Sequence, residues 1–470
     1  MTALTHAAAA PRERPLSTAG LLVLTVGALD SGLEGSIVLP ALPAIARHYD
    51  ASLVAVSWLA TGFLLAAVVA VPLLGRLGDL FGKRRLLLVA LGAFGLGSLI
   101  CALAGSIELV IAGRIVQGIG IAAGPLTYAL VRDTVEPERV PRAIGAVVGM
   151  ASVGATVGFV VSGLLVDHVS VMAIFWFLFA LAVVLIVSVA ALVPETSVRG
   201  HSSVDIGGAA SLGLGLACLL LAISKGRDWD WFSARIVGLF LAAAGFLTLF
   251  VLIERRIRDP LVDLQHVVKR PFVNAHVCAF TLGLAFFISA FLVPLIAATP
   301  EESGYGLGLT ITQTGLISSP VALGSLAAGW LGGRFVDVVG PRVLIATGSV
   351  LGVAGYVSLA LAHSSILSLC VGNAAVGLGI GFLLTSIAAV VVRTADQGKT
   401  SIAVAMTTVT RTIANAVGVA LTATIVAEAG VEAGFIDEDG FVWGFCLGAV
   451  GCGFALFAAV FMPGRPAAAR

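Results

Sequence analysis

Four ionisable residues lie inside long apolar stretches of the chain: Asp30, Glu34, Arg114 and Arg411. Such groups are costly inside a bilayer, so each is a candidate for function. Asp30 and Glu34 are four residues apart and therefore share one face of a helix. Their mutual repulsion and their removal from water both disfavour the ionisation of the two carboxyl groups together. We expect at least one of them to hold a proton near neutral pH, and the residue types leave open which one.

The two arginines suggest different roles. At 1.5 Å per residue, Arg114 lies about 10 Å from the outer end of its apolar stretch, and Asp30 lies about 12 Å from the outer end of its own. The two residues could therefore meet at one depth. An arginine that approaches and leaves a carboxylate alternately favours its ionised and protonated forms, which makes a proton switch. The alternative is a static ion pair. Arg411 stands in the segment TVTRTIANAVG near Asn415, where it either contacts a substrate or pairs with backbone carbonyl groups.

The composition identifies the surroundings of these residues as a membrane. Of the 470 residues, 59% are hydrophobic and only 11% are charged, whereas a soluble domain is about a quarter charged. This excludes a soluble enzyme, a nucleic-acid-binding protein and a disordered scaffold. The six cysteines form no C-x-x-C pair and are read as small buried hydrophobic residues. We expect no enzyme activity, no metal site and no bound cofactor, since no P-loop, metal-ligand cluster or nucleophile–base pair is evident.

Fourteen apolar runs have about the length of a membrane-spanning helix, which is 20 residues. The first run is long enough to span, so we expect an uncleaved helix instead of a signal peptide. The runs cover approximately residues 18–44, 53–74, 86–105, 107–131, 142–166, 171–193, 204–224, 235–253, 272–298, 311–332, 343–362, 366–392, 401–427 and 441–462.

The positions of the basic residues orient these spans. With the N-terminus inside, 21 of the 27 lysine and arginine residues fall in inside segments and four in outside segments. This is a strong positive-inside bias. We therefore expect a multi-pass protein of the inner (plasma) membrane with both termini in the cytoplasm.

One short loop occurs twice. Residues 75–85 read GRLGDLFGKRR and residues 333–342 read GRFVDVVGPR, with five matches at a constant offset of 258 residues. A repeated loop argues for two homologous bundles. We expect a tail over 1–17, a six-helix bundle over 18–195, an inserted helix pair over 196–256, a second bundle over 257–463 and a tail over 464–470. The loop is either a conformational latch, in which Asp79 pairs with a neighbouring helix, or a solvated inside turn.

Together these motifs resemble the major facilitator superfamily and, within it, the fourteen-span drug:proton antiporters, over roughly residues 18–462. The first loop matches the superfamily signature G-x-L-a-D-r-x-G-r-k-R, and the region around span 7 is similar to the inserted pair. The resemblance implies an all-α fold of two six-helix bundles plus two inserted helices, fourteen in all. It also implies that the loops form a latch, through Gly75, Arg76, Gly78, Asp79, Gly82, Arg84, Arg334, Asp337 and Arg342.

Three further segments carry the resemblance. IAGRIVQGIG at 111–120 is similar to the fourth-span signature, and LEGSIVLPALPAI at 33–45 to the first-span signature, with Glu34 in place of its aspartate. The resemblance therefore implicates Asp30, Glu34 and Arg114 in proton coupling. The fifth-span antiporter signature keeps its glycine spacing, although Phe159 replaces a proline and Ser162 a glycine. We expect these glycines to serve helix packing: Gly145, Gly154, Gly158 and Gly163.

In the superfamily, the first and fourth helices of each half line the substrate cavity. Here these are spans 1, 4, 9 and 12, and span 2 adds aromatic wall. The expected cavity residues are Trp58, Phe63, Gln117, Tyr128, Asn274, His276, Asn373 and Arg411.

The resulting expectation is a monomeric, proton-coupled secondary exporter of amphipathic small molecules, cations included, that works by alternating access. Its partners are a small-molecule substrate, protons as the coupling ion and membrane lipid, with no nucleic acid. Multidrug efflux and antibiotic resistance are implied by the resemblance alone. Three alternatives stay open: a dedicated exporter of one endogenous metabolite, antibiotic or lipid; a proton-coupled importer; and a non-transporting receptor or scaffold.

Overall fold

The computed structural model describes residues 17–136, 139–195, 205–226, 228–257, 270–394, 400–432 and 435–460. Within these ranges the side chains of 141–142, 148, 152, 270–272, 337, 392–394, 400–405, 431–432 and 435 are not described. The expected tails at 1–17 and 464–470 therefore lie outside the described residues, except for Ser17, as do most of both linkers of the inserted pair.

The described chain is helical apart from a two-residue hairpin, β1 (Val431–Glu432) and β2 (Phe435–Ile436). The N-terminal half contains α1 (Thr18–Ser36), α2 (Leu42–Tyr49), α3 (Leu53–Phe81), α4 (Lys83–Ala102), α5 (Ile107–Gly118), η1 (Ile119–Ala122), α6 (Ala123–Thr134), α7 (Val140–His168) and α8 (Ala173–Leu192). The remainder contains α9 (Ile206–Lys225), α10 (Ala234–Glu254), α12 (Arg270–Ala298), η2 (Glu301–Ser303), α13 (Ile311–Val339), α14 (Pro341–Leu361), α15 (Ile366–Thr394), α16 (Thr400–Ala429) and α17 (Glu438–Val460).

Among the described residues, thirteen helices are long and apolar enough to cross a membrane, with α5, η1 and α6 forming one of them. These thirteen match the expected second to fourteenth spans. The first differs, because the expected run over 18–44 is interrupted between α1 and α2. Pro40 lies in the interruption, and proline removes a helical N–H and clashes with the preceding turn. α1 itself has 19 residues and carries both Asp30 and Glu34, which lower its hydropathy.

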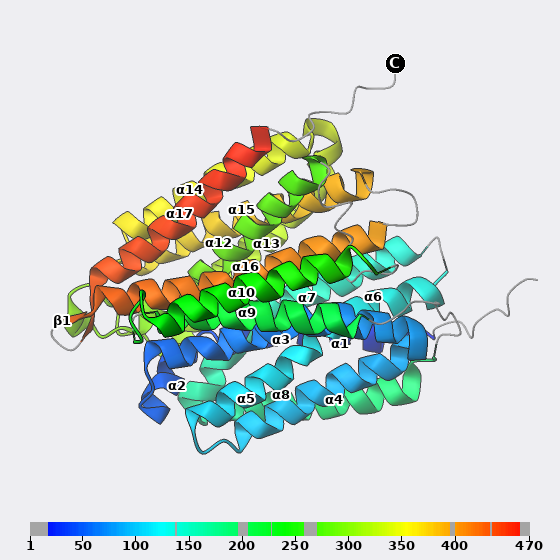
Figure 1. The fold of residues 1–470 in the computed structure, drawn as a ribbon, viewed down its shortest axis with the longest axis horizontal. Coiled ribbons are helices and arrows are strands. Elements are labelled where there is room, and N and C mark those ends of the chain that lie inside the picture. Colours follow the sequence, from blue (N-terminus) through cyan, green and yellow to red (C-terminus); the bar gives the residue numbers. More distant parts are fainter. Residues whose placement is uncertain are drawn as a thin grey trace, which may run out of the picture.

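The helices form two bundles with the same internal contacts (Figure 1). In the first bundle α1 packs on α7, α3 on α5, and α4 on both α5 and α8. In the second α12 packs on α16, α13 on α15, and α14 on both α15 and α17. Between the bundles, α3 meets α16 and α7 meets α13, and these two contacts are equivalent if the repeats are superposed. The repeated loops therefore belong to a repeat of the whole six-helix unit.

The inserted pair lies along one side of the seam between the bundles, as the green helices of Figure 1 show. α9 packs against α10, α3 and α16. Five buried apolar residues from these four helices form a small cluster of their own: Val68, Leu212, Leu216, Phe250 and Val409. Near the other end of α9, the Thr424 hydroxyl donates a hydrogen bond to the Ile223 carbonyl oxygen (3.2 Å). α9 thus touches both bundles.

The two ends of the seam are packed differently. We call the end with the α3–α4 and α13–α14 turns the loop end, and the opposite end the far end. One buried apolar cluster joins the far halves of the first bundle's helices, with Ile37, Phe63 and Phe159 among them, to the second bundle, with Ile288 and Phe291 among them. A separate cluster fills the loop half of the first bundle and contains no residue of the second. Within the described chain, the bundles therefore share a large core at the far end only.

Glycines let α7 approach its neighbours closely. A Cβ atom added to Gly154 would lie 2.0 Å from the Leu29 carbonyl oxygen of α1, and one on Gly158 would lie 2.1 Å from Ser36 Oγ. At Gly163 a Cβ would lie 2.2 Å from the Thr312 Cα atom of α13. At Gly145 it would meet nothing within 4 Å. Three of the four signature glycines are thus at helix–helix contacts, and Gly145 is not.

This difference predicts the outcome of a matched pair of substitutions. We expect Gly154→Ala to lower the free energy of unfolding by about 1–3 kcal/mol, because the methyl group forces α1 and α7 apart. Gly145→Ala, in the same helix, should change it by less than about 0.5 kcal/mol. The midpoints of thermal unfolding of the purified proteins in detergent measure both effects. Equal midpoints for the two variants would contradict this assignment of the close contact.

Candidate functional site

Arg114 lies at the centre of a buried polar network in the first bundle. Its side chain belongs to α5 and is 2% exposed. Its Nε donates to the Leu59 carbonyl oxygen of α3 (3.0 Å), and Nη1 donates to Gln117 Oε1 (2.8 Å). Gln117 Nε2 donates in turn to Ser98 Oγ of α4 (2.7 Å). The guanidinium carbon stands 4.0 Å from the centre of the Phe63 ring, at cation–π distance.

The acidic pair lies nearby on α1. Asp30 is 2% exposed and Glu34 is 1% exposed. Oδ1 of Asp30 and both carboxyl oxygens of Glu34 are buried without a hydrogen-bond partner among the described residues. Glu34 faces η1, the short 3-10 segment of the fourth span, where a Cβ on Gly120 would lie 3.4 Å from Glu34 Oε1. A buried carboxyl group without hydrogen-bond donors is more stable when it is protonated or when a ligand supplies the donors.

Arg114 and the acids do not form an ion pair in this conformation. Within the described part of the chain, no ion pair joins Arg114 to Asp30 or Glu34. Glu34 and Arg114 are nevertheless close enough to interact electrostatically. The structure therefore has the arginine held by Leu59 and Gln117 instead of by a carboxylate. A static ion pair, the alternative drawn from the sequence, is not what this conformation contains.

Two of the expected cavity residues are bound within a bundle instead of facing open space. Gln117 is fully buried in the Arg114 network. Asn373 of α15 is also fully buried, and its Nδ2 donates to the carbonyl oxygens of Ile317 and Ser318 of α13 (both 3.2 Å). Its Oδ1 accepts from the Ser289 hydroxyl of α12. In this conformation Asn373 joins three helices of the second bundle.

The other expected cavity residues come from both bundles. Phe63 is buried under Arg114, while Trp58 and Asn274 are half-buried. Tyr128 of α6 and Arg411 of α16 come from different bundles, are both half-buried and interact electrostatically. His276 of α12 is half-buried too, and its Nδ1 lies 2.8 Å from Thr410 Oγ1.

The first repeated loop is a turn fixed by charge. Gly82 has φ +109° and ends α3 as α4 begins, a conformation that favours glycine. Next to it, the Lys83 ammonium group is buried and forms an ion pair with Asp133 at the end of α6. The Glu195 carboxylate, beyond α8, accepts from the backbone N–H groups of Arg84 (3.0 Å) and Arg85 (3.2 Å). It thereby caps α4, where a helix N-terminus attracts negative charge.

The sequence analysis missed the contacts of Lys83, Asp133 and Glu195 at this loop. Lys83 stood in a run of three basic residues, and nothing in the run marks one of them as buried. Asp133 and Glu195 lie about 50 and 110 residues away in sequence, so only the fold brings them to the loop. A usable signal was that each follows directly on a spanning run, the fourth and the sixth.

The residues expected to form the latch differ in their burial and in their contacts. Gly78 is buried, and a Cβ on it would lie 2.7 Å from Leu126 Cδ2; at Gly75 a Cβ would meet nothing. The Asp79 carboxylate, near the end of α3, is half exposed and lies 3.6 Å from Nζ of Lys83, the first residue of α4, so this ion pair joins the two helices that the loop connects. Arg76 is half-buried, and the Arg84 guanidinium donates to the Ala190 carbonyl oxygen of α8.

The second repeated loop has the same backbone turn as the first, but its described arginine side chains are exposed. Gly340 has φ +87° and links α13 to α14 as Gly82 links α3 to α4. Arg334 and Arg342 are exposed. The side chain of Asp337 lies outside the described residues.

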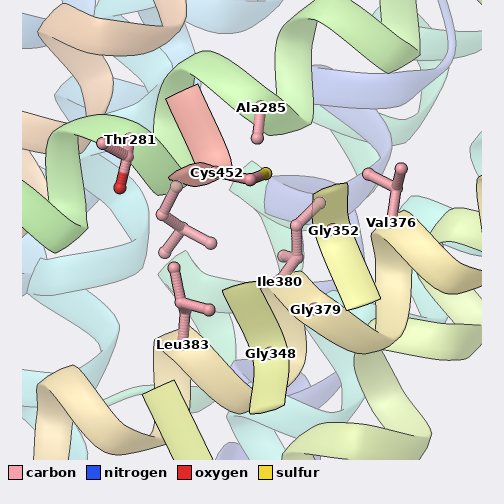
Figure 2. Close-up of a pocket in the computed structure, with 10 residues that line it drawn as sticks. Thr281, Ala285, Gly348, Gly352, Val376, Gly379, Ile380, Leu383 and Cys452 are labelled. Carbon is pink, nitrogen blue, oxygen red and sulfur yellow. The ribbon is translucent and has the colours of Figure 1, made fainter. Parts of the chain in front are cut away.

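A small apolar pocket lies inside the second bundle, between α12, α14, α15 and α17 (Figure 2). Glycines at 348, 352 and 379 form part of its wall, and Thr281 and Cys452 contribute the polar side chains. The pocket is enclosed by one bundle, so it does not lie on the seam between the two.

The fold and the seam define a polytopic α-helical membrane protein built from two repeated bundles. Residues 24–306 and 275–470 match the family model described as Major Facilitator Superfamily. The chain therefore belongs to the major facilitator superfamily.

Several relatives are named for drug resistance or export. Multidrug resistance protein 3 of Bacillus subtilis (strain 168) is 28% identical over 320 residues, which cover 67% of this chain and 60% of that protein. The Tetracenomycin C resistance and export protein of Streptomyces glaucescens is 33% identical over 320 residues, covering 66% and 59%. Multidrug resistance protein Stp of Mycobacterium tuberculosis (strain CDC 1551 / Oshkosh) is 27% identical over 398 residues, covering 84% and 73%. The chain thus spans about three fifths of the length of the first two relatives.

Solved structures share the fold. The human organic anion transporter MFSD10 (TETRAN) has a TM-score of 0.63 at 16% identity and covers 96% of this chain and 100% of its own. A point mutant of the nucleoside transporter NupG has a TM-score of 0.66 at 12% identity and covers 94% and 98%.

The latch geometry predicts that Asp133 matters more than Asp79 for stability. Asp133→Asn removes the buried partner of Lys83 and should lower the free energy of unfolding by about 3 kcal/mol. This is the lower end of the range for breaking a buried ion pair, because Asp79 remains near Lys83. Asp79→Asn removes a half-exposed partner and should cost less than about 1 kcal/mol. Thermal unfolding of both variants in detergent decides between them. A larger loss in Asp79→Asn would contradict the described pairing.

Proposed function

We propose that this protein is a proton-driven exporter of small amphipathic molecules that works by alternating access between the two bundles. The observation that carries the proposal is the acidic pair. Asp30 and Glu34 are buried in the first bundle, and three of their carboxyl oxygens have no donor among the described residues. A site of this kind accepts a proton readily, since only protonation removes its charge from the apolar interior.

Alternating access fits the uneven packing of the seam. At the far end the Asp167 carboxylate of α7 accepts from the backbone N–H groups of Ile311 (3.2 Å) and Thr312 (2.7 Å) of α13, so the bundles are joined there. The positive-inside bias puts the loop end in the cytoplasm and both termini with it. The present conformation would then receive substrate from the cytoplasm, and rocking of the bundles would release it outside.

Proton coupling follows from the place of the acids relative to Arg114. In the present conformation the guanidinium group binds the Leu59 carbonyl oxygen and Gln117, and it forms no ion pair with the two acids among the described residues. A helix movement that brings Arg114 to the carboxyl groups favours their ionised form and releases the proton. A proton entering from outside would then restore the present arrangement. The coupling ion is a proton, and no further cofactor takes part.

The names of the relatives support export over import. They differ in whether they refer to many compounds or to one. Two carry multidrug resistance in their names, and one names tetracenomycin C. Because that last relative is at 33% identity the most similar of the three, a dedicated exporter of one compound is the second candidate. We place the protein in the plasma membrane as a monomer.

The test is transport in proteoliposomes with an imposed pH gradient. Asp30→Asn and Glu34→Gln each remove an acid without changing side-chain size. Each should reduce gradient-driven transport at least tenfold, because the proton-binding site is lost. Substrate efflux and the counter-movement of protons are followed together, the latter with a trapped pH-sensitive dye. Ethidium, N-phenyl-1-naphthylamine and 8-anilinonaphthalene-1-sulfonate serve as the substrate panel.

Asp50→Asn is the matched control, since Asp50 is an exposed carboxylate at the end of α2. It should transport like the wild-type protein. Full proton-coupled transport by both Asp30→Asn and Glu34→Gln would remove the acidic pair from the mechanism. Movement of one compound only would favour the dedicated exporter.

A further inference from the structure

Arg411 is a charge inside the membrane for which the protein supplies no counter-charge among the described residues. It lies eleven residues from the start of α16, about 16 Å along the helix at 1.5 Å per residue. Within the described chain, no ion pair reaches Arg411 and its guanidinium group donates no hydrogen bond. The ionisable group that interacts with it is the Tyr128 phenol, not a carboxylate.

The sequence of the second bundle explains this lack. α12, α14 and α15 contain no aspartate or glutamate. The acids of α13, α16 and α17 all lie near a helix end: Asp337, Glu428, Glu438 and Asp439. No acid of these helices is therefore placed at the depth of Arg411. In the first bundle, by contrast, Arg114 has Glu34 within electrostatic reach.

The guanidinium group is also reachable. Arg411 and Tyr128 are both half-buried, they come from helices of different bundles, α16 and α6, and they are close enough to interact electrostatically. They belong to the half of the molecule in which the two bundles share no large core among the described residues. A molecule that enters the seam from the loop end therefore meets an arginine from one bundle and a phenol from the other.

A second polar group beside Arg411 is also incomplete. The Thr410 hydroxyl donates to the Met406 carbonyl oxygen (3.1 Å), so His276 Nδ1 must donate to Thr410 Oγ1 (2.8 Å). This leaves His276 Nε2, which is buried and has no partner among the described residues. When protonated it would be one more donor, from α12.

We propose that the seam between α6 and α16 is a binding site for the acidic group of an amphipathic organic anion, such as a carboxylate or sulfonate on an apolar body. The Arg411 guanidinium group donates a two-pronged pair of hydrogen bonds to the acidic group. The Tyr128 hydroxyl donates a further one from the opposite bundle. The anion supplies the counter-charge that the second bundle lacks, and its apolar part lies against the surrounding helices. This assignment rests on the proposed function and names the charge of its substrate.

The test compares two probes that differ mainly by an acidic group. 8-anilinonaphthalene-1-sulfonate is an anion, and N-phenyl-1-naphthylamine is its neutral counterpart; ethidium is the cation. Wild-type proteoliposomes should move the sulfonate in preference to ethidium. Arg411→Gln should lower transport of the sulfonate at low concentration at least tenfold, as expected for loss of a charged hydrogen-bonded pair. It should leave transport of the neutral probe within twofold.

Controls separate a lost contact from a lost fold. Arg47→Gln removes an exposed arginine of α2 and should match the wild-type protein for all three probes. Arg411→Lys keeps the charge and should restore part of the sulfonate transport. If Arg411→Gln does not fold, the preference of the wild-type protein decides: movement of the sulfonate but not ethidium supports the proposal, and the reverse overturns it.

The outcomes also separate this proposal from proton-driven export. Equal sulfonate transport by the wild-type protein and a folded Arg411→Gln variant would overturn the anion site. Gradient-driven transport of ethidium alone would overturn it too, while leaving proton-driven export intact. Sulfonate transport that depends on Arg411 but moves no protons would support the anion site and remove the proton coupling instead.

Discussion

A charge inside a bilayer needs an opposite charge or a full set of hydrogen bonds, and the spans of this protein are arranged around the few charges they contain. Arg114 satisfies this requirement with a carbonyl oxygen, an amide and an aromatic ring. Lys83 does so with Asp133. Asp30, Glu34 and Arg411 do not within the described residues, and the proposals above assign a mobile partner to each of them, a proton to the acids and a substrate to Arg411.

Much of the fold was predictable from the sequence, because hydrophobic length and the positive-inside bias are strong signals in a membrane. The repeated loop predicted the two bundles, and thirteen of the expected spans match helices of spanning length and composition. The first span was less regular than expected, because Pro40 interrupts it after α1.

The candidate site was less predictable. The sequence marked the charged residues in the membrane but not their partners, because Leu59, Ser98 and Glu195 meet them only after folding. It also suggested that Gln117 and Asn373 line a cavity, whereas both are fully buried in hydrogen-bonded positions here. Burial depends on which face of a helix meets another helix, and a nearly all-apolar span gives little indication of that face.

The inserted pair breaks the symmetry that the repeat would otherwise impose. The contacts of α3 with α16 and of α7 with α13 are equivalent by the repeat, yet in the described part of the chain α9 packs along the first of them, against α3 and α16. The helix pair covers that side of the seam over much of its length (Figure 1). For the exporter proposed above, the α7–α13 side is then the more open lateral route for an amphipathic molecule to the seam. The insertion thus makes the two sides of the seam unequal, although the repeat would make them equivalent.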